Sequence, residues 1–135
     1  MALDAVANFA EVTVSIGYNA SDTSIALSTG HGARLPQPST DGEFNITWWN
    51  FTDYPNPTDD PNKEIVRVTA RSTDTLTVTR GQEGITATTK NTGGKTYKMV
   101  LSITKKMMDD IESQLTNSGI TRGQSVAIYG GVTLN

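Results

Sequence analysis

Hydrophobic and polar residues alternate along several short runs of this chain, and the two clearest runs lie between Glu64 and Arg80. Both have a period of two and are rich in β-branched residues, which is typical of half-buried β-strands. Only the segment Arg71 to Asp74 separates them, so the sequence predicts an antiparallel hairpin. The same alternation predicts further strands at Glu11–Ile16, Thr23–Leu27, Phe44–Phe51 and Thr96–Ile103.

Helical periodicity is confined to the segment Thr104 to Asn117. Its apolar residues Met108, Ile111 and Leu115 follow a spacing of three and four, which places them on one face of a helix. Threonine at the first position is a suitable N-cap, and Gly119 provides a stop shortly after the last turn. By contrast, glycines and prolines between residues 30 and 38 predict a loop that is not helical.

These patterns indicate a mainly β fold: a small antiparallel β-barrel or sandwich with one C-terminal helix and a short β-prone tail. A length of 135 residues suits a single domain with a real core. The tail contains two β-prone runs that are too short to form a sheet alone. We expect an N-terminal arm at 1–10, a β-domain at 11–103, a helix at 104–118 and a C-terminal extension at 119–135, whose β-prone runs are Ser125–Tyr129 and Val132–Leu134.

The second strand of the predicted hairpin ends in an unusual sequence, Arg80-Gly81-Gln82-Glu83-Gly84. Each of the two glycines permits a positive φ without steric cost, so the sequence predicts a tight structural corner rather than a floppy loop. Arg80 and Glu83 are close enough in sequence to clamp the corner, either as an ion pair or through hydrogen bonds to the backbone.

This corner and the strand before it resemble a motif that recurs in structural proteins of tailed bacteriophages. In that motif a strand runs into R-G-Q-E-G-T-x-A, and here the sequence from Thr75 is TLTVTRGQEGITATT, with Ile85 where the pattern usually has threonine. Both residues are β-branched, so we expect this departure to matter little. The similarity covers roughly residues 11 to 112 and also includes Val12–Leu27, Leu35-Pro36, Phe44–Asn50 and Asn91–Val100.

The resemblance implies a non-enzymatic structural module of a phage virion, assembled in the host cytoplasm without a cofactor. Such modules are commonly homotrimers that contact other virion proteins. A tail appendage, either a fibre base or an adaptor, is the expected position, and a decoration protein on the capsid is the alternative. The apolar stripe Met108, Ile111 and Leu115 is the expected oligomer seam, because its spacing suits a short helical contact. The same stripe could instead pack on the chain's own β-domain.

Composition narrows the possible partners. The net charge is −3, and a nucleic-acid-binding surface would need clustered lysine and arginine. The chain has no cysteine, so disulfides and thiolate metal sites are excluded. No apolar run approaches 18 residues and no signal-peptide pattern begins the chain. We therefore expect neither a nucleic-acid partner nor a membrane.

A receptor- or glycan-binding module is a further possibility. Its surface would be formed by Trp48, Trp49 and Tyr54 together with the aspartate-rich loop that follows. Adjacent residues of a strand point to opposite faces, so one tryptophan should be in the core and the other under a loop or at a subunit contact.

Two patterns could indicate other chemistry. Asp53, Asp59 and Asp60 are oxygen ligands of the kind that Ca²⁺ binds, although their spacing matches no EF-hand. Gly94-Lys95-Thr96 resembles part of a phosphate-binding loop, but it lacks the required upstream glycine and precedes a predicted strand instead of a helix. The single histidine, His31, has no evident catalytic partner. No enzyme activity is predicted.

Overall fold

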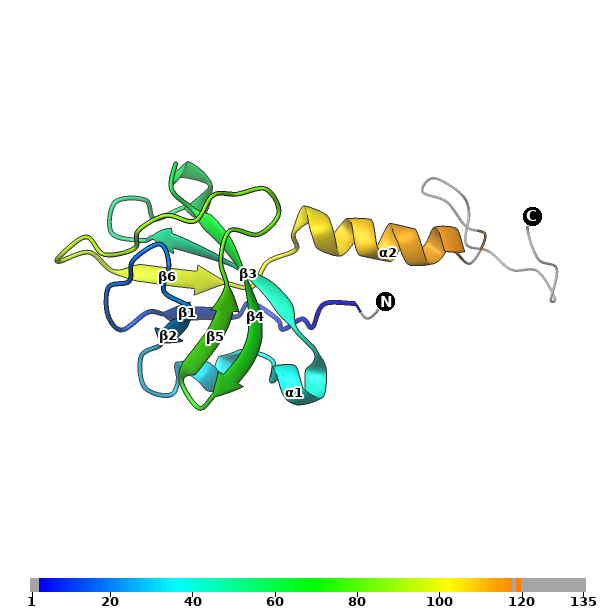
Figure 1. The fold of residues 1–135 in the computed structure, drawn as a ribbon, viewed down its shortest axis with the longest axis horizontal. Helices are drawn as coiled ribbons and strands as arrows, with labels where there is room; N and C mark the ends of the chain where they lie inside the picture. Colours follow the sequence, from blue (N-terminus) through cyan, green and yellow to red (C-terminus); the bar gives the residue numbers. More distant parts are fainter. Residues whose placement is uncertain (1–2, 118, 120–135) are drawn as a thin grey trace. The chain divides into compact units, whose positions relative to one another are not determined.

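The computed structural model describes residues 3–117 and 119, and its main feature is a six-stranded antiparallel sheet (Figure 1). The predicted mainly β fold is therefore confirmed. The chain divides into two units, one of residues 2–102 that contains the sheet and one that begins at Ile103 and contains the C-terminal helix. The strands are β1 (Glu11–Thr13), β2 (Ser24–Ala26), β3 (Phe44–Asn50), β4 (Glu64–Ser72), β5 (Thr75–Thr79) and β6 (Tyr97–Val100), in the sheet order β1-β6-β3-β4-β5-β2.

The two outer strands of this sheet, β1 and β2, are joined to each other just beyond their ends. Val14 and Leu27 form an isolated antiparallel bridge. Ser15 N donates to Ala26 O at 3.0 Å, and Ser28 N donates to Thr13 O at 2.8 Å. The sheet therefore curls into a small barrel whose edges pair with each other instead of remaining open.

The interior of the barrel is filled by the alternate residues that point inward from every strand. Cross-strand pairing places Val12 opposite Met99, Met99 opposite Trp48, and Trp48 opposite Glu64, so these four residues form one row across β1, β6, β3 and β4. All four are fully buried. The other large buried hydrophobic residues of this core include Ile25, Phe44, Ile46, Val66, Val68 and Leu76.

The predicted hairpin is present as β4 and β5, and its turn is shorter than expected. β4 continues to Ser72, so only Thr73 and Asp74 connect the strands. Thr73 adopts a positive φ of 54°. A shift in register between Val68 and Ala70 marks a β-bulge, which increases the local twist and helps the sheet to curl.

The region between residues 30 and 41 is partly helical, so the expectation of a non-helical loop was wrong. His31–Arg34 forms the 3-10 helix η1, and Pro38–Asp41 forms the short helix α1. Pro38 occupies the first turn of α1, where its missing N–H has no intrahelical partner to lose and its fixed φ is already helical. A second 3-10 turn, η2, spans Pro57–Asp59 in the loop after β3.

The C-terminal helix α2 spans Lys105–Asn117, one residue shorter than predicted at its start. Thr104 caps it, since its hydroxyl accepts a hydrogen bond from Met107 N. Gly119 has a φ of 85°, and its N–H donates to Thr116 O at 2.9 Å, as expected of a helix stop. Both β-prone runs of the predicted extension lie outside the described residues.

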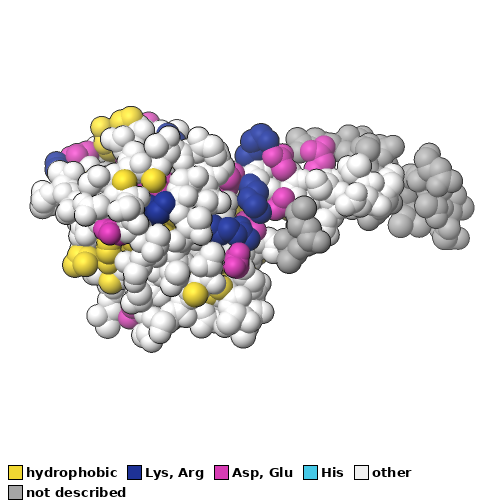
Figure 2. Space-filling model, in the orientation of Figure 1, with side chains coloured by type: hydrophobic (Ala, Val, Ile, Leu, Met, Phe, Trp, Pro, Cys, Tyr) yellow, Lys and Arg dark blue, Asp and Glu magenta, His cyan; other side chains and the backbone are white. Residues whose placement is uncertain are grey.

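Figure 2 shows one face of the molecule, on which the charged side chains occur in a few groups. On the face shown, basic and acidic side chains are interspersed, and hydrophobic side chains form several small patches instead of one continuous surface. Within the described part of the chain, no helix is long and apolar enough to cross a membrane.

Candidate functional site

The sequence Arg80 to Gly84 forms the tight corner that its glycines predict. Gly81, Glu83 and Gly84 all have positive φ, at 62°, 54° and 77°. Gln82 N donates to Ile65 O at 2.8 Å, which fastens the corner to β4. A side-chain hydrogen bond from Gln82 Nε2 to Arg80 O, at 3.2 Å, closes it. The corner therefore has a defined backbone conformation and is hydrogen-bonded to strand β4 of the barrel.

The side chain of Arg80 is buried, and its main hydrogen-bond partner is a residue outside the corner motif. Its Nε and Nη2 donate to the two carboxylate oxygens of Glu64 at 2.7 and 2.8 Å. The remaining donors reach the backbone oxygens of Asn19, Asp22 and Thr88. All five N–H groups of the guanidinium are therefore used. The ion pair of Arg80 is made with Glu64 and not with Glu83. Its hydrogen bonds to backbone oxygens are of the kind that the other alternative expected.

A second cation, Lys90, completes this buried cluster. Its ammonium lies 3.4 Å from Glu64 Oε1 and 3.0 Å from Asn62 O, and it also contacts the hydroxyl of Thr88. The charged ends of Arg80 and Lys90 lie 4.9 and 5.5 Å from the ring centre of Trp48. Cations at such distances are attracted by the negative face of an aromatic ring. One carboxylate and one indole thus hold two buried cations.

The environment of the cluster shifts two pKa values. Burial by itself raises the pKa of Glu64, but hydrogen bonds from Arg80, Thr88 and Gly81 outweigh it, so the net pKa lies below the ordinary value of 4.5. Burial lowers the pKa of Lys90 below its ordinary value, and the attraction of Glu64 opposes this only in part. Glu64 is therefore held as the anion on which the cluster depends.

Glu83 takes part in a separate network on the other side of the corner. It accepts a hydrogen bond from Asn45 Nδ2 at 2.8 Å. Asn45 Oδ1 in turn accepts from Arg67 Nη1 at 3.1 Å, and the same nitrogen reaches Asp4 Oδ1 at 3.1 Å. Arg67 Nε also donates to Glu43 at 3.0 Å. The corner is thus connected through β3 and β4 to the N-terminal arm.

The two glycines of the corner predict different responses to substitution. A Cβ at Gly81 would lie 3.1 Å from Ile85 O, whereas a Cβ at Gly84 would meet nothing within 4 Å. We expect Gly84→Val to cost about 1–3 kcal/mol through backbone strain alone, and Gly81→Val to cost more than Gly84→Val. Thermal or urea unfolding measures both. Gly93→Val is the control, because the φ of Gly93 lies outside the left-handed region and a Cβ there would be in open space.

The two tryptophans do not form a contact surface. Trp48 is fully buried in the core and Trp49 is only 2% exposed, so the expected surface of Trp48, Trp49 and Tyr54 is wrong for both indoles. Trp49 points to the outer side of β3 but is covered by the following loop, where its Nε1 donates to Tyr54 O at 2.9 Å. Tyr54 itself is partly exposed.

The three aspartates of the loop after β3, Asp53, Asp59 and Asp60, have different environments. Asp60 is almost completely buried and accepts hydrogen bonds from the backbone N–H groups of Asn50 and Asn62. Asp53 pairs with Lys95 at 2.6 Å, and this contact lowers the pKa of its carboxyl. Asp59 is exposed. Among the residues described, no group of three or more such side chains is placed to hold a metal ion, so the candidate cation site at Asp53, Asp59 and Asp60 is not formed.

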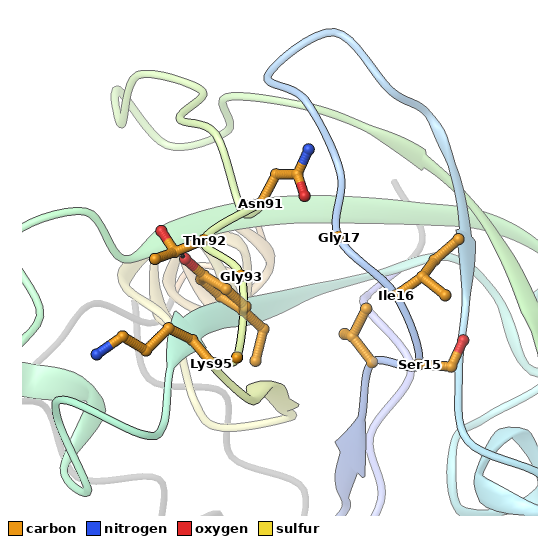
Figure 3. Close-up of a pocket in the computed structure, with 10 residues that line it drawn as sticks. Ser15, Ile16, Gly17, Asn91, Thr92, Gly93 and Lys95 are labelled. Carbon is orange, nitrogen blue, oxygen red and sulfur yellow. Dashed lines mark hydrogen bonds between the residues drawn. The ribbon is translucent and has the colours of Figure 1, made fainter.

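A small hollow of about 150 Å³ lies between residues 14–17 and the segment 91–97 (Figure 3). The backbone of Ser15, Ile16 and Gly17 runs along one side of the hollow, with the side chains of Ser15 and Ile16 turned away from the loop of Gly93 and Lys95 on the other side. The lysine extends away from the opposite segment, toward Asp53, and strand β6 follows it instead of a helix. The prediction that Gly94-Lys95-Thr96 precedes a strand, and not the helix of a phosphate-binding loop, is therefore confirmed.

His31 has a structural contact, since its Nδ1 accepts a hydrogen bond from Thr13 N at 2.9 Å.

A shallow groove of about 210 Å³ lies on the outer face of the sheet. Its floor is formed by Thr47, Ile65 and Val100, which pair directly across β3, β4 and β6. These side chains are only partly buried. The walls come from the loop after β3, from the residue that follows the corner and from the end of β6, through Pro57, Thr58, Lys63, Ile85 and Ser102. Most of the exposed lining is apolar.

Comparison of the chain with protein-family models and with curated proteins finds no match. The described residues that the corner motif brings together are occupied by internal hydrogen bonds, and sequence reasoning missed their main partners, Glu64, Lys90 and Asn45. The one signal for Glu64 is that it falls in phase with the inward-pointing Val66 and Val68.

Proposed function

We propose that this protein is a non-enzymatic structural protein of a tailed-phage virion, a trimeric β-rich module mounted on a tail appendage. The resemblance of the segment Thr75–Thr89 to the phage motif supports this proposal. The geometry of the corner is consistent with it, because Arg80 and Gly81 bind to the barrel instead of facing a substrate cavity. Catalysis would instead need reactive groups that converge on an accessible pocket.

The observation that carries the proposal is the stripe Met108, Ile111 and Leu115 on α2. These side chains are 44%, 39% and 38% exposed in the single chain. A 13-residue helix is marginal alone in water and gains most of its stability by packing its apolar face. A seam between copies of the helix would bury the stripe at the spacing of a short coiled coil.

The test of the seam is the oligomeric state of the full chain. We expect the wild-type protein to form a trimer, and Ile111→Asp to be a folded monomer, because a buried carboxylate in the seam has no partner. Light scattering measures the mass, and circular dichroism checks the fold. Glu112→Gln on the same helix, outside the stripe, is the control and should remain trimeric. A folded trimer of Ile111→Asp would contradict the seam.

Reconstruction of an intact particle decides between the possible positions. Density on a tail fibre base or adaptor supports the proposal. Density on the head shell would instead favour a capsid decoration protein, which is the second candidate because the motif does not distinguish the two. The burial of Trp48 and Trp49 removes the main reason for a glycan-binding module.

A further inference from the structure

The N-terminal arm displays its large apolar side chains to solvent and turns its small ones inward. Ala5 and Ala10 are buried, whereas Leu3 is 46%, Val6 67% and Phe9 100% exposed. This is the reverse of the usual arrangement of a segment laid on a core. The arm is held in place by Ala5 N, which donates to Glu43 O at 3.1 Å, and by the ion pair described above between its aspartate and β4.

Phe9 is the most unusual of these residues. Its φ is 52°, a region that costs a residue with a Cβ conformational strain, and its side chain has no cover in the single chain. Its neighbour Ala10 accepts a hydrogen bond from Leu101 N at 2.9 Å, so Phe9 lies near the end of β6. Ser102, at that same end, lines the outer groove. An exposed ring therefore lies close to an open apolar groove.

The ring and the groove match in size and chemistry. Apolar cavities of about 150 Å³ in proteins accept benzene, and this groove has about 210 Å³ with a mostly apolar lining. Ile65, Val100 and Ile85 supply that lining. Since Phe9 is completely exposed, it does not occupy the groove of its own chain.

We propose that Phe9 of one copy inserts into the groove of a second copy of this chain, and that the second copy returns the same contact. The occupant we infer is a second copy, because the chain itself carries both the exposed ring and the apolar groove, and two such copies can make the same contact twice. One phenylalanine offers roughly 150–250 Å², so a one-way contact buries too little for a specific interface. Reciprocal insertion buries two rings, roughly 300–500 Å², together with the small exposed lining of two grooves. This is well below the roughly 1,000 Å² of a stable interface and suits only a weak and reversible pair.

This contact goes beyond the proposed trimer, because it uses residues of the barrel unit and none of α2. It would join a subunit of one trimer to a subunit of another trimer. Its failure and the failure of the α2 seam are therefore distinguishable: Phe9→Ser should leave a trimer intact, and Ile111→Asp should leave the barrel contact intact.

The first test is sedimentation of the full chain carrying Ile111→Asp over a range of concentrations. We expect reversible dimers, and we expect Phe9→Ser to weaken them by at least about tenfold. Ile85→Thr, which keeps the branched shape of the groove wall but adds a hydroxyl, should weaken them less. Ile16→Ser is the control, since Ile16 is also exposed, at 61%, but lies outside the groove. A variant that is monomeric throughout, or equal effects of Phe9→Ser and Ile16→Ser, would overturn the proposal.

The second test locates the contact and uses the absence of cysteine from the chain. Mixed Phe9→Cys and Ile65→Cys proteins, each also carrying Ile111→Asp, should form a disulfide-linked heterodimer under mild oxidation. Ile16→Cys mixed with Ile65→Cys should not. If another occupant fills the groove, such as residues 120–135 of the same chain, neither mixture forms a heterodimer and the proposal fails.

Discussion

Replacing Glu64 with glutamine should lower the free energy of unfolding by about 3–5 kcal/mol, because it leaves two buried cations without their anion. The substitution keeps the size of the side chain but removes the charge that binds Arg80 and Lys90. It also turns one acceptor oxygen into a donor that faces the N–H groups of the corner. Urea unfolding measures the change.

The matched control for this substitution is Glu43→Gln. Glu43 also pairs with an arginine, at 3.0 Å from Arg67, but its side chain is 47% exposed. Exposed ion pairs contribute about 0–1 kcal/mol, so we expect a small effect. Equal effects of the two substitutions would mean that the Glu64 cluster is no more important than a surface pair.

The same cluster predicts how stability depends on pH. Because the pKa of Glu64 is lower in the folded state than its ordinary value of 4.5, the folded protein binds fewer protons there than the unfolded chain. The contribution of Glu64 is therefore complete above about pH 4.5 and is lost as the pH falls through the folded-state pKa. Unfolding curves should show a shallower acid dependence for Glu64→Gln than for the wild type.

Trp48→Ala should also destabilise the protein by about 3–5 kcal/mol, the range expected when a large buried side chain leaves a cavity. Trp48 lies at the centre of the inward row and is fully buried. The ring also supports both cations and makes an edge contact with Tyr18 at 6.0 Å between ring centres. Chemical unfolding followed by circular dichroism measures the loss without depending on tryptophan fluorescence.

Phe51→Ala is the control for the aromatic substitution. Phe51 follows β3 directly and is 36% exposed, so its removal leaves a smaller cavity and should cost clearly less. A similar loss for both variants would show that the Trp48 cluster has no special role in the core.

The sequence predicted the parts of this fold that depend on local periodicity. Strands β3, β4 and β5 were expected from alternation, and α2 from its 3–4 spacing with a threonine cap, because each pattern reports the face that an element buries. The strained corner was also predictable, since glycine is the residue that adopts positive φ at no cost. The seam expected at Met108, Ile111 and Leu115 remains a prediction.

The missed features depend on contacts between residues far apart in the chain. Glu64 and Arg80 are 16 positions apart, and Asn45 and Glu83 are 38 apart. No local pattern predicts such pairs. The position of Trp49 was left open for the same reason, because alternation placed it on the outer face but could not show that the following loop covers it. The helical turns η1 and α1 were missed because glycines and prolines were interpreted as breakers, whereas η1 includes Gly32 and Pro38 begins its helix.

The joint between β1 and β2 sets where this barrel should open first. Adjacent strands elsewhere in the sheet share ladders of three to five paired positions, but this joint has a single bridge, formed by two backbone hydrogen bonds and supported by the hydrogen bond from Ser15 Oγ to Ala26 O. Local opening is least costly where the fewest bonds are broken. The amides of Ser15 and Ser28 should therefore exchange with solvent before those of the central strands β3 and β4. Such an opening would expose two complementary strand edges, each able to accept the opposite edge of a neighbouring molecule and thus to exchange strands with it.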